Sequence, residues 1–258
     1  MERVALVRRP AATLADGITT FIDREPVDVD LAVRQWHGYV QAMADHGWTI
    51  DDVDPDDSCP DSVFIEDAAF VFGSTAVIAN PGADERKPEV PPVAARLADL
   101  GLDLVRVEAP GTLDGGDVLK IGDDIYIGLG GRTNEAGIAQ VSELLASQGA
   151  RVHAVPCDRA LHLKSAVTAL PDGTVLGWAP VVPNEALPPV LGMPEEPGAH
   201  VVDLGDGHVL MAASAPISAE HIAARGYTPV TVDISEFEKL EGCVTCLSIR
   251  VRRLPSAD

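Results

Sequence analysis

The fold prediction starts from residues 113–128, LDGGDVLKIGDDIYIG, where Asp114 and two glycines precede an apolar strand, a tight turn and a second strand. The same order of features occurs at residues 66–82, EDAAFVFGSTAVIANPG, and at residues 161–177, LHLKSAVTALPDGTVLG. A fainter copy occupies residues 201–216. Recurrence of one short unit along the chain predicts a repeat architecture.

Helical patterns lie between these predicted hairpins, and each ends at or near a glycine. They cover residues 31–48, 91–102, 134–150 and 218–227. Further strands follow two of them, such as LDLVRVEAP at residues 102–110 and ARVHAVPC at residues 150–157. The unit is therefore strand, strand, helix, strand, with a length of about 50 residues.

The two ends of the chain look like halves of one further unit. RVALVRRP at residues 3–10 would pair with CVTCLSIRV at residues 243–251. Repeats of this kind favour a closed ring, because closure protects strand edges. We therefore expect an α/β fold of five pseudo-symmetric blades in a single domain over residues 1–258. An ordinary α/β sandwich with five hairpins is the alternative.

The composition excludes several classes of partner. The formal net charge of −21 in 258 residues repels phosphate backbones and anionic membranes, so we expect no nucleic acid and no membrane partner. No apolar run approaches the length of a membrane span, and MERVALVRRP lacks the apolar region of a signal peptide. With only four cysteines, reduced thiols in the cytoplasm are the expectation.

The polar heads of the repeats are candidates for chemistry. Asp67, Asp114 and His162 are 47 and 48 residues apart, so a ring would place them, with Cys246, at the inner ends of separate blades. A cysteine becomes a good nucleophile when a base or cation lowers its pKa. Cysteine, histidine and an orienting carboxylate together form a nucleophilic triad. The alternatives are a core histidine and a simple turn at Asp114.

Cys243 and Cys246 form a C-x-x-C pair. No second ligand pair accompanies it, which disfavours a zinc site, and the residues that follow, LSIRV, predict a strand rather than the helix start of a redox pair. On a strand, residues three positions apart face opposite sides. We therefore expect only one of the two sulfurs to point into any site.

Acids and arginines in the loops suggest a ligand with two charged ends. Glu66 and Asp67 stand directly before an apolar strand, and Asp61 lies just upstream. Buried acids need a cationic partner. Arg86 and Arg132 occupy equivalent places in successive repeats and could clamp a carboxylate. A ligand with a guanidinium at one end and an α-carboxylate at the other fits this layout.

The chain closely resembles the dimethylarginine dimethylaminohydrolases of the amidinotransferase superfamily. The resemblance covers nearly the whole chain and rests on FIEDAAF, NPGADER, TLDGGDVLKIGDDIYIG, GRTNEAG, LHLKSAVTALPDGTVLG and EGCVTCLSIRV, in that order. It implies a five-bladed α/β propeller that hydrolyses methylated arginines. The departures are Asn80 and Lys87, where the family has arginines more often, and Ile18 in place of leucine.

Carried over residue by residue, the resemblance implies that Cys246 is the nucleophile and His162 the acid and base, oriented by Asp114. Cys243 would be a bystander that points the other way. The resemblance assigns the other site residues to three groups. The guanidinium would be held by Asp61, Asp67 and the neighbouring Glu66, the substrate carboxylate by Arg86 and Arg132, and the α-amino group by carbonyls near Ile18 and Leu240.

The implied reaction converts asymmetric dimethylarginine or monomethylarginine to citrulline and an amine through a covalent S-alkylthiouronium on Cys246. It needs no metal and no organic cofactor, and the chain would act as a monomer or a homodimer. The alternatives are an arginine deiminase, an amidinotransferase of the same superfamily, and a propeller that binds arginine-like ligands without turnover.

Overall fold

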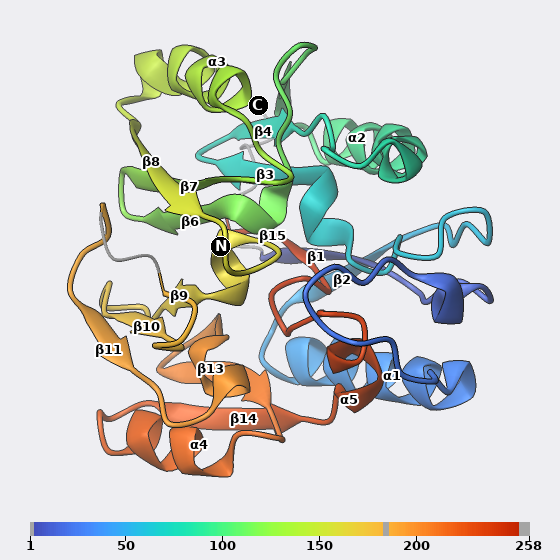
Figure 1. Cartoon of the computed structure of the whole chain (residues 1–258), viewed down its shortest axis with the longest axis vertical. Coiled ribbons are helices and arrows are strands. Elements are labelled where there is room, and N and C mark those ends of the chain that lie inside the picture. The colour runs from blue at the N-terminus through green and yellow to red at the C-terminus, as the bar shows by residue number, and fades with distance from the viewer. Residues whose placement is uncertain (1–2, 183–185, 253–258) are drawn as a thin grey trace.

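The computed structural model describes residues 3–182 and 186–252. In these residues, strands form five three-stranded sheets arranged around a common axis (Figure 1). The sheets are β15–β1–β2, β3–β4–β5, β6–β7–β8, β9–β10–β11 and β12–β13–β14. The predicted α/β class and the five-fold repeat are therefore confirmed, and the sandwich alternative is not what the chain forms.

All five sheets share one arrangement, in which the middle strand pairs antiparallel with the inner strand and parallel with the outer strand. The antiparallel pair is a hairpin in four sheets and joins the two ends of the chain in β15–β1–β2. The strands are β1 (Val4–Arg8), β2 (Thr49–Val53), β3 (Ala69–Phe72), β4 (Thr75–Ile78), β5 (Asp103–Arg106), β6 (Val118–Ile121), β7 (Asp124–Gly130), β8 (Arg151–Cys157), β9 (Val167–Ala169), β10 (Val175–Gly177), β11 (Val190–Gly192), β12 (Val202–Gly205), β13 (His208–Ala212), β14 (Thr228–Val232) and β15 (Ile249–Val251).

A helix makes the parallel crossover in four of the five sheets, as parallel pairing requires a long connection. The four crossover helices are α1 (Val29–Asp45), α2 (Val90–Asp99), α3 (Glu135–Leu145) and α4 (Pro216–Ala223). A fifth, short helix, α5 (Ser235–Glu238), follows β14 and makes no crossover. In the fourth sheet, the described residues between β10 and β11 contain no helix, so that unit departs from the predicted strand, strand, helix, strand order.

The first and last strands close the ring in the β15–β1–β2 sheet, which we call the closing sheet. β1 pairs antiparallel with β15, with Val4 opposite Val251 and Leu6 opposite Ile249. This is the predicted pairing of the two chain ends, although the strand at the C-terminal end begins only at Ile249. Residues 244–247, which the sequence pattern assigned to a strand, form a turn.

The ends of the helices follow local capping chemistry. The Asp28 side chain accepts a hydrogen bond from the Leu31 amide at 2.9 Å, which starts α1 before the predicted position. Gly47, with a φ of +79°, lies in the left-handed conformation that ends the helical segment. Asn134 caps α3 in the same way through the Gly137 amide. The predicted helices are therefore present, with ends shifted by a few residues.

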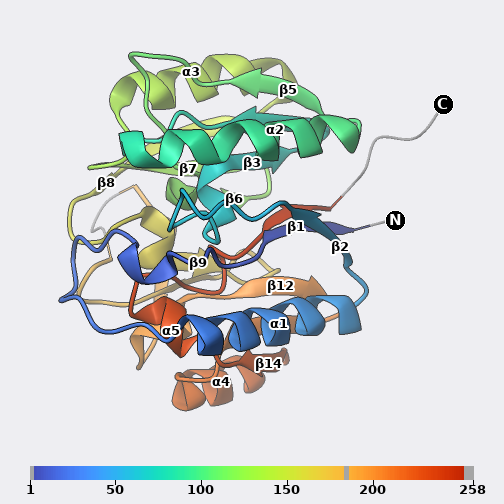
Figure 2. The same cartoon turned by 90° about the vertical axis from the view of Figure 1, so that its right-hand side faces the viewer.

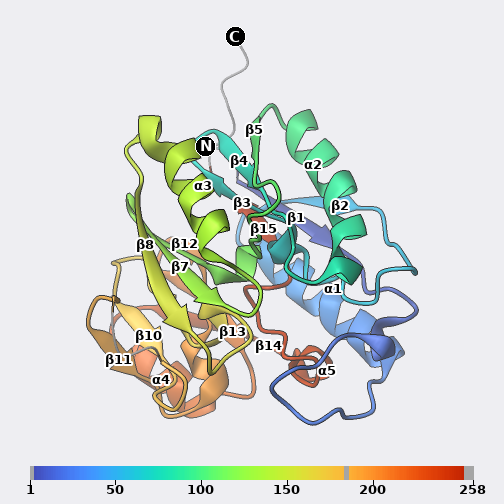
Figure 3. The same cartoon turned by 45° about the horizontal axis from the view of Figure 1, so that its top comes forward.

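The helices lie on the outside of the ring, as Figures 2 and 3 show for α1, α2 and α3. Trp36, Tyr39 and Met43 of α1 are buried in an apolar cluster with residues of the closing sheet and of the fifth sheet. Leu97 of α2 is buried in a second cluster with residues of the closing sheet and of β3 and β4. The core is thus divided into clusters between neighbouring blades.

The innermost strands are β15, β3, β6, β9 and β12, because residues from all five line one central cavity. A short turn precedes each of them. These turns are the 3₁₀ helices η2 (Ile65–Ala68), η4 (Gly115–Asp117), η6 (Leu163–Ser165) and η7 (Glu196–Ala199), and the turn at residues 244–247. The ring therefore gathers five turns from distant parts of the sequence around one axis.

Over the ranges 3–182 and 186–252, the longest helices are too short or too polar to cross a bilayer.

Loss of a buried side chain in the closing sheet should strongly lower the stability of the protein. Leu6 is fully buried on β1, so Leu6→Ala should lower the free energy of unfolding by about 2–5 kcal/mol, as expected for a core leucine. Urea unfolding followed by circular dichroism measures this. Ile22→Ala is the control, since Ile22 is 42% exposed and should change stability by about 0.5 kcal/mol or less. Equal midpoints for both variants would contradict the burial argument.

Candidate active site

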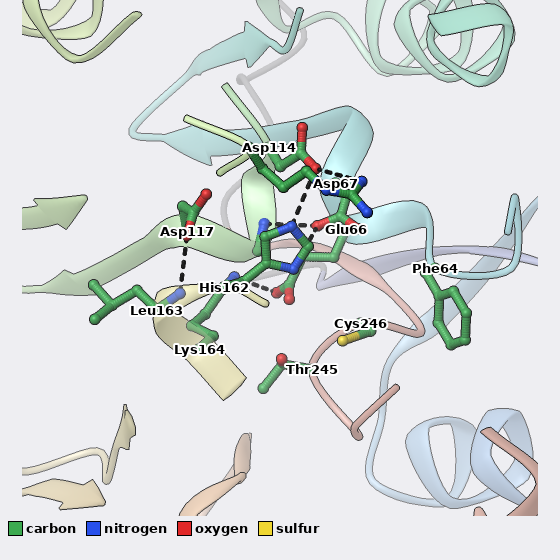
Figure 4. Close-up of polar contacts among 12 residues, drawn as sticks. Phe64, Glu66, Asp67, Asp114, Asp117, His162, Leu163, Lys164, Thr245 and Cys246 are labelled. Atoms are coloured by element: carbon green, nitrogen blue, oxygen red, sulfur yellow. Dashed lines mark hydrogen bonds and ion pairs between the residues drawn. The ribbon is translucent and has the colours of Figure 1, made fainter. Parts of the chain in front are cut away.

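The predicted catalytic residues lie in the turns that precede the innermost strands. Asp67 lies in η2 before β3, Asp114 is the residue before η4, and His162 is the residue before η6. Cys246 lies in the turn before β15. Equivalent positions in four blades therefore supply the four groups, and Figure 4 shows them around one space.

A small pocket joins most of the residues that the sequence singled out. Its walls are formed by Ile18, Asp61, Phe64, Asp67, Arg86, Arg132, Leu161, His162, Leu240, Glu241, Gly242 and Cys246. The free volume is about 20 Å³, which is room for about one water molecule.

His162 is buried between two carboxylates. Its Nε2 lies 3.1 Å from Asp114 Oδ2, and its Nδ1 lies 3.8 Å from Asp67 Oδ1. Burial disfavours the charged imidazolium, but the charge of Asp67 and the hydrogen bond to Asp114 outweigh it and raise the pKa of His162 to about 9. At neutral pH the imidazole is therefore protonated and can donate a proton.

Asp67 is held as a carboxylate despite being buried. Its oxygens accept hydrogen bonds from the Arg86 guanidinium and, at 2.8 Å, from the Gly116 amide. Burial alone would raise its pKa, but the charges of His162 and Arg86 lower it to about 2. A Cβ atom at position 116 would lie 2.6 Å from both Asp67 Oδ1 and His162 Nδ1, so this close approach requires glycine.

Arg86 differs from the sequence prediction, in which it clamps a substrate carboxylate with Arg132. It lines the pocket, but its guanidinium contacts Asp67, Glu89 at 2.7 Å, and the main-chain carbonyls of Asp61 and Phe64 at 3.1 Å. These partners already occupy its donors. The side chain is buried and fixes the position of Asp67.

Arg132 is less constrained. It approaches Asp114 at 3.7 Å, and its side chain is 13% exposed. Arg86 and Arg132 were predicted to have the same role, but their surroundings differ. Glu89, three residues after Arg86, forms an ion pair with the Arg86 guanidinium. Arg132 is the one whose guanidinium can still reach a new partner.

Among residues 3–182 and 186–252, no cationic side chain lies within ion-pair distance of Asp61, since Arg86 and Arg132 contact other acids. Its carboxylate accepts hydrogen bonds from the Ile18 amide at 3.1 and 3.2 Å. Burial raises its pKa in spite of the charge of Arg86. A cation entering the pocket would therefore stabilise the ionised form of Asp61.

Glu66 lies outside the pocket, contrary to its predicted place beside the guanidinium. Its carboxylate contacts Lys164 Nζ and Arg250 Nη2, each at 2.5 Å. The 3₁₀ geometry of η2 turns the adjacent Glu66 and Asp67 in different directions, and the sequence alone did not show which one faces the pocket.

The two sulfurs of the C-x-x-C pair meet, whereas a strand would have separated them. Cys243 Sγ and Cys246 Sγ are 3.3 Å apart, and the Cys243 amide lies 3.4 Å from Cys246 Sγ. The prediction that Cys243 points away is therefore wrong, because the segment turns between the two residues. The hydrogen bond between the two sulfurs lowers the pKa of Cys243 to about 5 and raises that of Cys246.

Two residues that support the pocket, Glu241 in its wall and Asp117 behind it, were missed by the sequence analysis. Glu241 accepts hydrogen bonds from the amides of Thr20 and Phe21 at 2.7 and 2.6 Å, which ties the loop after Ile18 to the pocket rim. Asp117 accepts from the Leu163 amide at 2.9 Å and so holds the turn that carries His162. The only signal for either was its place beside a quoted motif, in LEGC and LDGGDV.

The described residues contain one group of side chains close enough to share a metal ion, formed by Asp67, Asp114 and His162. Asp114 is hydrogen-bonded to His162, and Asp67 is already paired with Arg86. This use of the donor atoms favours proton transfer over metal binding.

Asn80 and Lys87, the two departures from the family pattern, both have partners within the protein. Asn80 donates to the Gly111 carbonyl, and Lys87 pairs with Asp84 on the surface.

Comparison with known proteins identifies a relative that matches nearly the whole chain. The chain is 58% identical over 254 residues to an N(G),N(G)-dimethylarginine dimethylaminohydrolase of Streptomyces coelicolor, with 98% of each chain covered.

The chain belongs to the dimethylarginine dimethylaminohydrolase family.

Two solved structures of this family match the fold. One is a variant with an adduct of S-methyl-L-thiocitrulline, at 31% identity and a TM-score of 0.89, covering 97% of this chain and 100% of that one. The other is a cysteine-to-serine variant from Pseudomonas aeruginosa in complex with citrulline, at 30% identity and a TM-score of 0.88, with the same coverage. No family model matches the chain.

The protonation of His162 gives a pH prediction. Its raised pKa stabilises the folded protein fully below pH 6.5, and this contribution is lost as the pH rises toward about 9. An NMR titration should show the His162 imidazole protonated at pH 7. Asp114→Asn should lower the pKa of His162, because it removes a negative partner of the imidazole. Asp124→Asn is the control and should leave the pKa of His162 unchanged, because Asp124 contacts the distant His153 instead. A His162 that titrates below pH 6.5 in the unaltered protein would contradict the network.

Proposed function

We propose that this chain hydrolyses Nω-methylated arginines, asymmetric dimethylarginine and monomethylarginine, to citrulline and dimethylamine or methylamine. The observation that carries the proposal is the pocket that brings the thiol of Cys246 and the protonated imidazole of His162 together with the buried carboxylates of Asp61 and Asp67. The relatives' names and the citrulline and thiocitrulline ligands of the solved family members support the same chemistry.

The pocket suits a cationic substrate at its inner end. Asp61 and Asp67 provide negative charge, and the raised pKa of Asp61 indicates that its charge is poorly compensated in the free protein. A guanidinium bound there would also favour the thiolate form of Cys246. We therefore assign the guanidinium to the space between Cys246 and these carboxylates.

The other end of the substrate is assigned to the pocket rim. Arg132 would hold the α-carboxylate, while Arg86 acts indirectly by positioning Asp67. Main-chain carbonyls near Ile18 and Leu240 would receive the α-amino group. Glu66 is not part of this assignment, since it lies outside the pocket.

The reaction proceeds in two halves. The Cys246 thiolate attacks the guanidinium carbon, and the departing amine takes the proton of His162, leaving an S-alkylthiouronium. The neutral His162 then takes a proton from water, which attacks the same carbon as the Cys246 thiolate leaves and citrulline forms. Asp114 holds Nε2 of His162, so Nδ1 is the nitrogen that exchanges protons.

The assignment also covers the organisation of the protein. The pairing of β1 with β15 supports action as a single domain, and the reaction as written uses no metal or organic cofactor. Action as a monomer or homodimer in the cytoplasm stays a prediction.

A matched assay tests the reaction. The purified chain is incubated with arginine, monomethylarginine and asymmetric dimethylarginine, and citrulline and the released amine are measured. Citrulline with dimethylamine is the expected result, with turnover lost in Cys246→Ser and lowered about 10²–10⁴-fold in His162→Ala. Cys59→Ser is the control, because Cys59 is buried outside the pocket.

Other outcomes of this assay would point elsewhere. Ammonia from arginine would identify an arginine deiminase. Absence of product from all three substrates would contradict hydrolysis and favour an amidinotransferase or an arginine-binding propeller.

The two arginines should separate in kinetics. Arg132→Met should raise KM strongly with a smaller effect on kcat, because it removes contact with the substrate carboxylate. Arg86→Met should lower kcat, because Asp67 and His162 lose their alignment. Steady-state kinetics with asymmetric dimethylarginine measures both values. An unchanged kcat in Arg86→Met would contradict its positioning role.

A further inference from the structure

A second, larger cavity lies on the axis of the ring. It has a volume of about 600 Å³ and is lined by the innermost strands β3, β6, β9, β12 and β15, and we call it the central basin. It shares no lining residue with the pocket of Cys246 and extends to the β6–β7 turn, at the far end of β6 from Asp114. The two cavities are therefore separate, and the central basin extends from the turns beside the pocket, at Glu66, Lys164 and Thr245, to the far end of β6.

Positive charge is concentrated in the central basin. Lys120, Lys164 and Arg250 lie along its walls, with Glu66 as the carboxylate between two of them. This contrasts with the whole chain, whose formal net charge is −21. The two remaining lining acids are Asp203, which pairs with Arg252 at 2.9 Å, and Asp123, which is exposed in the turn after β6.

Lys120 is the least compensated of these cations. Its Nζ donates to the Val71 carbonyl at 2.5 Å, and within the described part of the chain no carboxylate lies within ion-pair distance of it. Its side chain is exposed to the basin. The basin walls remove part of its water and lower its pKa, and the charges of Lys164 and Arg250 lower it further. The positive potential that disfavours the ammonium would favour an anion.

Glu66 alone cannot neutralise the charges of Lys120, Lys164 and Arg250. Glu66 Oε1 accepts from both Lys164 and Arg250, so one negative charge serves two cations, and Lys120 has none. The side chains of Lys164 and Arg250 are 10% and 17% exposed, so water compensates them only in part. Partly enclosed charges interact more strongly than charges in bulk water.

We propose that the central basin binds a compact, multiply charged oxyanion, held by Lys120, Lys164 and Arg250. Lysine and arginine together suit phosphate or carboxylate groups, with arginine giving forked hydrogen bonds. The volume admits a small organic phosphate or a tricarboxylate and falls within the usual range of small-molecule sites.

Such a ligand would contact the same turns that carry the proposed catalytic groups. Glu66 is adjacent to Asp67, Lys164 follows His162 by two residues, and Arg250 lies on the strand that Cys246 precedes. Binding would draw Lys164 and Arg250 from Glu66. This connection rests on the proposed function, whereas the binding site itself does not.

Calorimetric titration of the full chain tests the proposal without any substrate. Inorganic pyrophosphate and citrate are the probes, at low and at raised ionic strength. We expect one saturable site per chain whose affinity falls with salt, as for a charge-driven interaction. Tighter binding of pyrophosphate would assign phosphate ligands, and tighter binding of citrate would assign carboxylates.

Three variants locate the site. Lys120→Met should weaken binding about tenfold or more, since it removes one of the three positive charges that face the basin. Lys120→Arg should largely restore binding. Lys87→Met is the control, because Lys87 is exposed, pairs with Asp84 and lies outside the basin. Circular dichroism confirms that each variant is folded.

Two results would overturn the proposal. One is the absence of saturable binding of either probe up to about 10 mM, weaker than any useful affinity. The other is equal affinity in the unaltered chain and in Lys120→Met, which would place any bound anion elsewhere. Neither result depends on whether the chain hydrolyses methylarginines.

Discussion

The arrangement of the site depends on the buried ion pair between Asp67 and Arg86. Arg86 also holds Glu89 and two main-chain carbonyls, so the guanidinium locks η2 against the segment that leads into α2. Asp67 in turn accepts from Gly116 and faces His162, which joins a second and a third blade. An ionised carboxylate in a buried place is tolerated only with such partners. The Asp67–Arg86 pair thus fixes the position of Asp67, and Asp67 in turn fixes the position of the His162 imidazole.

Much of the fold could be predicted because the repeat places the same chemistry at the same position in each blade. Ala69, Phe70 and Val71 of one inner strand and Val118 and Leu119 of the next are buried. The polar heads at Asp67 and Asp114 lie close together, as the period implies. The helix ends were less accessible, since Asp28 ends up capping α1 through one side-chain hydrogen bond. A short local contact of this kind leaves little trace in periodicity.

The errors in the site share one physical cause, which is that the pattern of a segment does not show the direction of its side chains. The residues after Cys243 are apolar and partly β-branched, as in a strand, but they are buried because they lie at the centre of the ring and turn there. Glu66 and Asp67 are adjacent acids that a 3₁₀ turn separates. Arg86 and Arg132 match in sequence position, yet Glu89 captures only the first.

The contact between the two sulfurs has a consequence for chemical labelling. At 3.3 Å, Cys243 and Cys246 occupy one shared space, and an alkyl group attached to either would fill the room that the other needs. The remaining cysteines, Cys59 and Cys157, are buried at other places in the ring. A bulky thiol reagent should therefore reach a stoichiometry of one per folded chain at this site, so the C-x-x-C pair counts as a single reactive unit.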